Sequence, residues 1–299
     1  MKNNNRSKVR IQADLLMLLA AIIWGGGFVA QRFASQYLNL FAFNGIRFIM
    51  AGLILLPLGL RYMGKFDRHL LWILPGGVLL FGGSALQQAG VATTSAGSAG
   101  FITGVYVVLV PLFLATFWRA KIPLINWLAA LAALGGTYLL STGGKSIQPS
   151  SGDWLELAGA VVWAFHVIVV GLAVHKVNLF AFSVGQFLLC GILNLLLCQF
   201  ISPITWSAIL PALPEVLYGG ILSVAVGFTL QAVGQSNAPT KDAVLILSLE
   251  SVFAAIFGAL ILFERMNWIQ IIGCAIIMTA IIGAQIISVR KESQLQGVN

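Results

Sequence analysis

The sequence predicts an all-α membrane protein whose ten transmembrane helices form two inverted five-helix repeats. Two observations support this fold class directly. Hydrophobic residues make up 59% of the 299-residue chain and charged residues only 9%. Soluble domains contain about 25% charged residues, so lipid rather than water must solvate much of this surface. The second observation is a similarity between the two halves of the chain, described below.

Apolar runs long enough to cross a bilayer fill the chain. A helix needs about 20 apolar residues to span the hydrocarbon core, and polar breaks separate the runs. The candidate helices are 14–33, 40–60, 70–90, 97–118, 124–142, 154–174, 180–202, 214–235, 243–263 and 268–289. The first run continues past Trp24 without a convincing cleavage site, so we interpret it as a retained helix rather than a signal peptide.

The distribution of basic residues predicts the orientation. Thirteen Lys and Arg residues fall on one side of the predicted membrane: Lys2, Arg6, Lys8, Arg10, Arg61, Lys65, Arg68, Arg119, Lys121, Lys176, Lys241, Arg290 and Lys291. The opposite side has only Arg32, Lys145 and Arg265. Cytoplasmic loops carry the excess of Lys and Arg. Both termini are therefore predicted to be cytoplasmic. The net charge of +8 follows this loop pattern and does not indicate nucleic-acid binding.

Residues of the first half recur in the second half at nearly constant spacing. Asp14, Trp24 and the sequence 41–43 match Asp153, Trp163 and the sequence 180–182, all with the same separation, here called the first repeat spacing. Further along, the Leu-Gln pair at 86–87 matches the pair at 230–231 with a slightly larger separation, the second repeat spacing. The predicted units are residues 1–142, with the N-terminal tail, and 143–299, with the C-terminal tail.

The odd number of helices in each unit predicts that the second unit enters the membrane from the opposite face. Inverted repeats of this kind are typical of transporters, where a central site opens alternately to either side. Duplication that only builds a stable bundle is the competing interpretation.

Several short motifs resemble the EamA-type members of the drug/metabolite transporter superfamily. They are Trp24-Gly25, the stretch 44–48, the Gly-rich segment that ends at Pro111, the sequence 249–251 and Glu264. The resemblance covers essentially the whole chain in a five-plus-five layout. It implies a bacterial inner-membrane carrier, often an exporter of amino acids, metabolites or drugs. Many members have Leu-Glu-Pro where this chain has Ser251, so no proline kink is expected in the ninth helix.

Arg47 is the most conspicuous candidate for the site. It lies about eight residues into the second helix, where a charge costs about 2.5–3.5 kcal/mol and should face protein or water. Its repeat partner is the polar Gln186. Arg47 is either a fixed positive charge for a substrate carboxylate or phosphate, or a structural residue bound to backbone carbonyls or to Glu250.

Two other titratable groups lie deep within the predicted membrane helices, Glu250 and His166. Glu250 is a candidate for proton coupling or for an ion pair with Arg47. His166 changes charge near neutral pH and is a candidate for substrate or proton contact. Each also has a structural interpretation. Glu250 is then a carboxyl at the packing interface of the ninth helix, and His166 is a hydrogen-bonded histidine of the core. The expected coupling is facilitated diffusion or weak proton exchange.

The remaining candidates are aromatic and amide side chains within the predicted helices. Trp24 and Trp163 lie too deep for the interfacial aromatic belt, so they are expected to flank a cavity or to pack in the core. Further candidate ligand contacts are Asn44, Gln87, Tyr106, Gln186 and Gln231.

The sequence favours a carrier of a small amphiphilic metabolite that works by alternating access. A membrane-embedded lipid-modifying enzyme is the alternative, but no nucleophile with an orienting base, paired aspartates or metal-ligand spacing occurs. Filter motifs of a channel are also lacking. The expected partners are the substrate and the bilayer, with no cofactor or metal. The GxxxG pattern at 100–104 leaves a monomer or a homodimer open.

Overall fold

The protein forms a bundle of ten membrane-spanning helical segments in the computed structural model. The structure describes residues 2–62, 68–94, 96–146, 150–201, 203–261, 263 and 265–296, and these residues contain no strand. Ten segments are long and apolar enough to cross a membrane, with bounds close to the predicted ones. Lys65 and Glu264, used above for orientation and for the family resemblance, lie outside the described residues.

The first five spans are built from six α-helices and a short 3-10 turn. They are α1 (Lys2–Ala34), α2 (Leu40–Tyr62), η1 (Arg68–Trp72) with α3 (Ile73–Thr93), α4 (Ala96–Thr103) with α5 (Tyr106–Phe117), and α6 (Leu124–Thr142). Gly143 ends α6 in the left-handed conformation, with φ of 57°, which favours glycine.

The last five spans contain one broken span and a π-helix. They are α7 (Ser151–Ala173), α8 (Leu179–Ile201), α10 (Leu213–Leu217) with the π-helix η2 (Tyr218–Phe228) and α11 (Thr229–Asn237), α12 (Thr240–Leu247) with α13 (Glu250–Ile261), and α14 (Trp268–Gln296). The four-residue α9 (Trp206–Ile209) precedes the eighth span. Ser150 and Asp153 form a capping box that starts α7.

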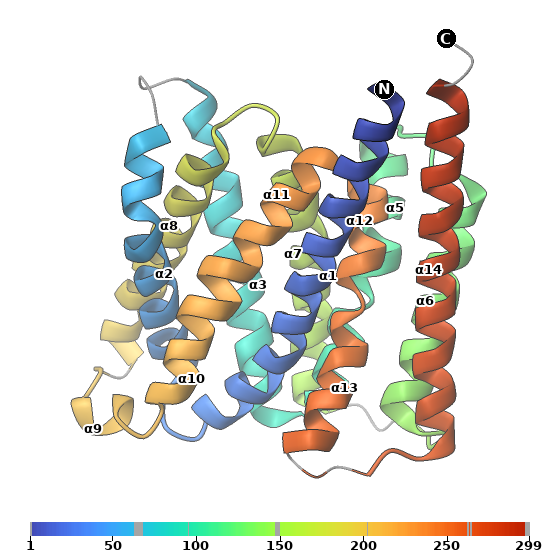
Figure 1. The fold of residues 1–299 in the computed structure, drawn as a ribbon. Coiled ribbons are helices and arrows are strands. Elements are labelled where there is room, and N and C mark those ends of the chain that lie inside the picture. Colours follow the sequence, from blue (N-terminus) through green and yellow to red (C-terminus); the bar gives the residue numbers. More distant parts are fainter. Residues whose placement is uncertain are drawn as a thin grey trace.

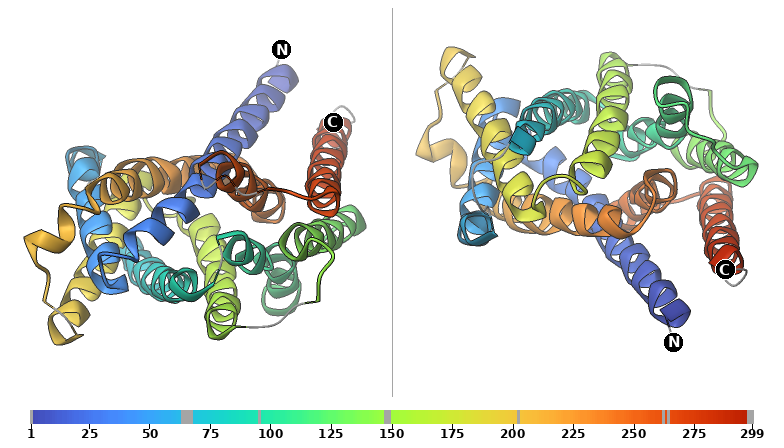
Figure 2. Two further views of the ribbon diagram at one scale, coloured as in Figure 1. Left: turned by 90° about the horizontal axis from the view of Figure 1, so that it is seen from below. Right: turned by 90° about the horizontal axis from the view of Figure 1, so that it is seen from above.

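The bundle has an elongated cross-section. The views along the helices place α2 and α8 at one end of this cross-section and α6 and α14 at the other (Figure 2). The N-terminus and the C-terminus lie at the same end of the bundle (Figure 1), here called the terminal end. Because α1 begins and α14 finishes there, the loops after α1, α3 and α6 lie at the opposite end.

Two spans are broken near their middle. They correspond to the predicted helices 97–118 and 243–263, for which the sequence predicted no break. In the fourth span, the N–H of Val105 donates to the carbonyl of Ile102 and that of Val107 to Gly104. In the ninth span, the N–H of Leu249 donates to Ile246 and that of Ser251 to Ser248. These tight i to i−3 turns separate α4 from α5 and α12 from α13 at positions related by the second repeat spacing. As expected, no proline causes the break in the ninth span.

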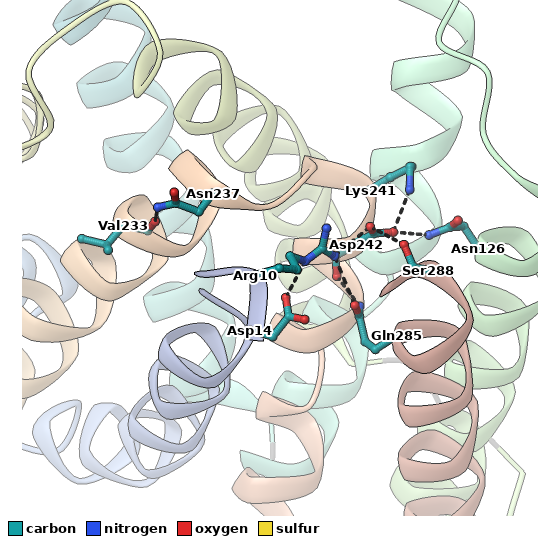
Figure 3. Close-up of polar contacts among 9 residues, drawn as sticks. All are labelled: Arg10, Asp14, Asn126, Val233, Asn237, Lys241, Asp242, Gln285 and Ser288. Carbon is teal, nitrogen blue, oxygen red and sulfur yellow. Dashed lines mark hydrogen bonds and ion pairs between the residues drawn. The ribbon is translucent and has the colours of Figure 1, made fainter. Parts of the chain in front are cut away.

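A buried ionic network joins four spans at the terminal end (Figure 3). The fully buried Asp242 carboxylate accepts hydrogen bonds from Arg10 Nη2 at 2.8 Å and Lys241 Nζ at 2.9 Å. It also accepts from Asn126 Nδ2 at 2.7 Å and from Ser288 Oγ at 2.9 Å. Arg10 Nε donates to Asp14 Oδ1 at 3.0 Å, and Gln285 Nε2 donates to the Asp242 carbonyl. We call these seven residues the terminal-end network.

Candidate functional site

A cavity lies where the two broken spans meet α1, α2, α3, α7 and the span formed by η2 and α11. It holds about 540 Å³ of empty space, counted with the open space at its mouth. Its wall consists of fourteen residues: Trp24, Phe28, Gln31, Arg47, Gln87, Thr103, Tyr106, Trp163, His166, Val167, Ser223, Phe228, Gln231 and Glu250. Phe28 and Gln31 belong to the last two turns of α1, and Arg47 lies in the first half of α2. The cavity therefore extends from the middle of the bundle toward the end opposite the termini.

Three aromatic rings form an apolar wall. The Phe228 ring lies 4.8 Å from Trp24 and 5.9 Å from Trp163, measured between centroids. The two tryptophans pack against glycines: a Cβ atom on Gly83 would lie 3.0 Å from Trp163, and one on Gly227 would lie 2.6 Å from Trp24. Stacked and tilted rings of this kind suit an aromatic or aliphatic ligand group.

Arg47 provides a positive charge that the protein holds in one position. Its side chain is 4% exposed, and its guanidinium lies 4.9 Å from the Phe43 and Phe48 ring centroids. Arg47 Nε donates to Asn44 Oδ1 at 3.0 Å, and Asn44 Nδ2 donates to the Ser84 carbonyl. Within the described residues, Arg47 forms an ion pair neither with Glu250 nor with any other carboxylate. A desolvated guanidinium of this kind is suited to a carboxylate or phosphate.

Glu250 and Tyr106 face each other at the two helix breaks. Tyr106 is the first residue of α5 and Glu250 the first of α13, and both side chains line the cavity. Broken membrane helices supply half-helix ends to the ligand sites of transporters. The cavity thus has a carboxyl on one side and a guanidinium on another.

His166 is held by a second amide. His166 Nε2 lies 3.1 Å from Gln186 Oε1. With the Gln186 oxygen as acceptor, the imidazole proton is on Nε2, and Nδ1 is left to accept. Gln186 thus orients His166 from behind the cavity wall.

Several buried polar atoms of the wall have no hydrogen-bond partner among the described residues. They are Gln31 Oε1, Trp163 Nε1, His166 Nδ1 and both amide atoms of Gln231. Trp24 differs from Trp163, because Trp24 Nε1 donates to the Ser223 carbonyl at 3.0 Å. Buried polar groups are normally paired, so these atoms are suited to a polar ligand.

The structure brings eight of the ten predicted site residues to one wall. Asn44 and Gln186 do not line the cavity but hold Arg47 and His166 in place. Two lining residues were not predicted from the sequence: the apolar Phe228, which lies at the centre of the aromatic cluster, and Thr103. Glu156 and Asp242, which were not among the predicted titratable groups, are fully buried as well. The described residues contain no group of three or more His, Cys, Asp and Glu that could hold a metal ion.

Ten apolar spans around a central cavity with polar and aromatic walls define a multi-pass membrane transport protein. The EamA-like transporter family model matches residues 11–142 and again residues 150–285. The chain therefore belongs to the EamA-like transporter family.

Individual relatives agree with this assignment. An uncharacterized transporter of Archaeoglobus fulgidus is 31% identical over 279 residues, which cover 91% of this chain and 85% of the relative. The threonine/homoserine exporter RhtA of Salmonella typhimurium is 25% identical over 98% of this chain and 92% of its own length. The uncharacterized transporter YetK of Bacillus subtilis is 24% identical over 96% and 89% of the two chains.

A solved crystal structure supports the fold independently. It superposes with a TM-score of 0.75 at 20% sequence identity and covers 93% of this chain and 98% of its own. At this identity the likeness concerns the fold alone.

The prediction of an EamA-type transporter is confirmed by the family match. Membership of a transporter family supports a carrier over a lipid-modifying enzyme.

Proposed function

We propose that the protein is a secondary transporter that exports a small amphiphilic metabolite by alternating access. The observation that carries this proposal is the cavity, in which the Arg47 guanidinium, the Glu250 carboxyl and three aromatic rings surround one space. Such a site matches a ligand with a carboxylate, a hydrogen-bonding or cationic group and an apolar part. Amino acids, related metabolites and amphiphilic drugs have this chemistry.

The proposed site divides into three roles. Arg47 binds an anionic group, with Asn44 fixing its guanidinium. Trp24, Trp163 and Phe228 contact the apolar part, while Gln87, Gln231 and Tyr106 donate or accept hydrogen bonds. Glu250 and His166 contact a cationic group or exchange a proton, with Gln186 orienting His166.

Alternating access requires two units of opposite orientation, 1–142 and 143–299, and paired glycine contacts support this arrangement. Trp24 packs on Gly227 and Trp163 on Gly83, and the two repeat spacings relate one pair to the other. Gly52 faces Leu188 in the same way that Gly191 faces Ile49. The two breaks, at Gly104 and Ser248, are related by the second repeat spacing and have the same hydrogen-bond pattern.

The proposed location is the bacterial inner membrane, with both termini in the cytoplasm. The excess of Lys and Arg on one side of the spans supports this orientation, and both termini lie at the terminal end of the bundle (Figure 1). With this orientation the terminal-end network closes the cytoplasmic side, and the cavity extends toward the periplasmic side.

Transport into proteoliposomes tests the proposal. Radiolabelled L-threonine and L-homoserine are the first probes, because one relative is named as an exporter of both. We expect Arg47→Gln to reduce uptake of the anionic or zwitterionic probe about 10- to 100-fold, as loss of a charged hydrogen bond costs about 1.5–3 kcal/mol. Arg61→Gln, at the terminal end of α2, serves as a matched control. Unchanged uptake by Arg47→Gln contradicts the role given to Arg47.

A thermal-shift screen extends the search to other ligands. Detergent-purified protein is heated with amino acids, nucleosides, sugars and cationic dyes, and a ligand of the folded state raises the melting temperature. A true cavity ligand stabilises the wild type and not Arg47→Gln. Equal stabilisation of both proteins places that ligand outside the cavity.

A further inference from the structure

Glu156 is a buried carboxyl to which the proposed function gives no role. It lies on α7, and its side chain is fully buried. Glu156 Oε2 accepts a hydrogen bond from Thr103 Oγ1 at 3.0 Å. Glu156 Oε1 has no hydrogen-bond partner among the described residues. The group is therefore held by a neutral hydroxyl and not by a charge.

Thr103 connects this carboxyl to the cavity. It lines the cavity as the last residue of α4, directly before the break in the fourth span. Glu156 itself is not part of the cavity wall, so a single hydroxyl group separates the carboxyl from the space proposed for substrate. The break gives Thr103 a place where the backbone can change conformation.

Among the described residues, no cation pairs with Glu156. The ion pairs of these residues do not include it. Its titratable neighbours are two further carboxyls, Asp153 on α7 itself and Glu250 on α13. From α3, a Cβ atom on Gly90 would lie 2.6 Å from Glu156 Cγ, so α3 presents backbone here. On α12, Asp242 is already paired within the terminal-end network.

An ionised carboxylate in this position would be a buried charge without a partner. Such charges cost several kcal/mol in protein interiors and in membranes. A neutral carboxylic acid avoids this cost and gives Glu156 an O–H donor. The surroundings therefore favour a bound proton in the conformation seen here.

The corresponding place in the other half of the chain is apolar. Met17, which the first repeat spacing relates to Glu156, packs against Gly234 as Glu156 packs against Gly90. Leu247, which the second repeat spacing relates to Thr103, is the last residue of α12 as Thr103 is of α4. The same packing is thus achieved by Met and Leu, so the bundle does not need a carboxyl and a hydroxyl at this site.

We propose that Glu156 binds the proton that is exchanged for substrate, with Thr103 as its contact to the cavity. This inference rests on the proposed transport function. Glu156 holds the proton while the cavity has the present shape. When movement at the break admits water to Thr103, the Thr103 hydroxyl gives its proton to that water and takes the Glu156 proton in its place. The reverse transfer from water on the other side restores the proton on Glu156. Glu250 is then left to contact substrate.

Infrared spectroscopy tests proton binding without a substrate. Difference spectra of the purified full-length protein between acidic and alkaline pH report the carbonyl stretch of protonated carboxyl groups. We expect a band from a buried carboxylic acid in the wild type that is lost in Glu156→Gln and retained in Glu250→Gln. Glu215→Gln, a carboxyl outside the cavity wall, is the matched control. Persistence of the band in Glu156→Gln, or no such band in the wild type, overturns the proposal.

Two transport assays separate this proposal from the proposed function. Exchange of L-threonine across proteoliposomes without a pH gradient measures transport itself, and accumulation driven by a gradient measures coupling. With one proton exchanged per substrate, a gradient of about one pH unit sustains a concentration ratio of up to about tenfold. We expect Glu156→Gln to retain exchange and to lose the accumulation.

A second variant guards against misfolding. Glu156→Met copies Met17 at the corresponding place in the other half, and it is expected to fold, exchange and fail to accumulate. Accumulation like that of the wild type in either variant overturns the role of Glu156. Absence of exchange in the wild type for every probe contradicts the proposed function instead, while the infrared result for Glu156 stands.

Discussion

The two ends of the bundle are held together differently. At the terminal end, Asp242 is fully buried and accepts hydrogen bonds from two cations, Arg10 and Lys241. At the opposite end, Arg32 Nη1 donates to the carbonyls of Val91 and Thr94, neither of which is charged. The terminal end therefore has a buried ionic network, whereas these contacts at the opposite end are made to neutral groups.

Residues related by the repeat show the same difference. Asp14 is paired with Arg10 at the terminal end. Its counterpart Asp153 accepts from the Thr94 hydroxyl at 2.7 Å and from the backbone N–H of Ser150. Asp14 thus has a charged partner, whereas Asp153 has neutral hydrogen-bond donors. Under the proposed alternating-access mechanism, this difference predicts that the two ends resist opening unequally and that the terminal end is closed in the present conformation.

The largest effect is expected from Asp242→Ala. Removing one partner of a buried ion pair leaves uncompensated charge and costs about 3–5 kcal/mol. Arg10 and Lys241 both lose their buried acceptor in this variant. We expect a clear fall in the melting temperature of the detergent-purified protein. Asp153→Ala at the opposite end is the control and should cost less, so equal losses would remove the distinction between the two ends.

The tryptophans provide a smaller test within the cavity. Trp24 Nε1 has a backbone acceptor at Ser223, whereas Trp163 Nε1 has none among the described residues. Trp24→Phe should therefore destabilise the protein by about 1 kcal/mol through its lost hydrogen bond. Trp163→Phe loses ring packing but no hydrogen bond, so it should destabilise the protein less than Trp24→Phe and should weaken ligand binding. Thermal melts with and without a ligand from the screen check both variants, and the reverse pattern would contradict these assignments.

The smallest effect is expected from Thr94→Val at the opposite end. This change removes the hydroxyl that donates to Asp153 Oδ1 and leaves the Arg32 contacts to backbone carbonyls in place. The expected loss is about 0.5–1.5 kcal/mol, the usual net value of one hydrogen bond. Chemical denaturation in mixed micelles measures it. A loss as large as that of Asp242→Ala would show that the opposite end is held as firmly as the terminal end.

The sequence predicted the spans well because each span is a long apolar run with polar ends. It did not predict the two breaks. Gly104 and Ser248 stand within apolar runs without a proline beside them, and the broken segments pack against α1 and α7, contacts that the apolar pattern does not reveal.

The site shows the same limit of prediction. Trp24, Arg47, Trp163 and Glu250 were found because such residues are uncommon in apolar helices. Phe228 could not be distinguished from other apolar residues, since only its position among the other rings makes it part of the site. Glu156 was missed because it lies close to the predicted start of its helix, although its side chain is fully buried and contacts Gly90 and Thr103.

Access to the cavity from each side of the membrane tests the central claim most directly. Gln31, in the cavity wall near the opposite end, is changed to Cys in a protein whose three native cysteines are replaced by Ala. A membrane-impermeant maleimide is then added to either side of oriented vesicles. We predict labelling from the side opposite the termini, and labelling from the terminal side only when Asp242→Ala is added. Labelling of the parent protein from the terminal side alone would contradict the account.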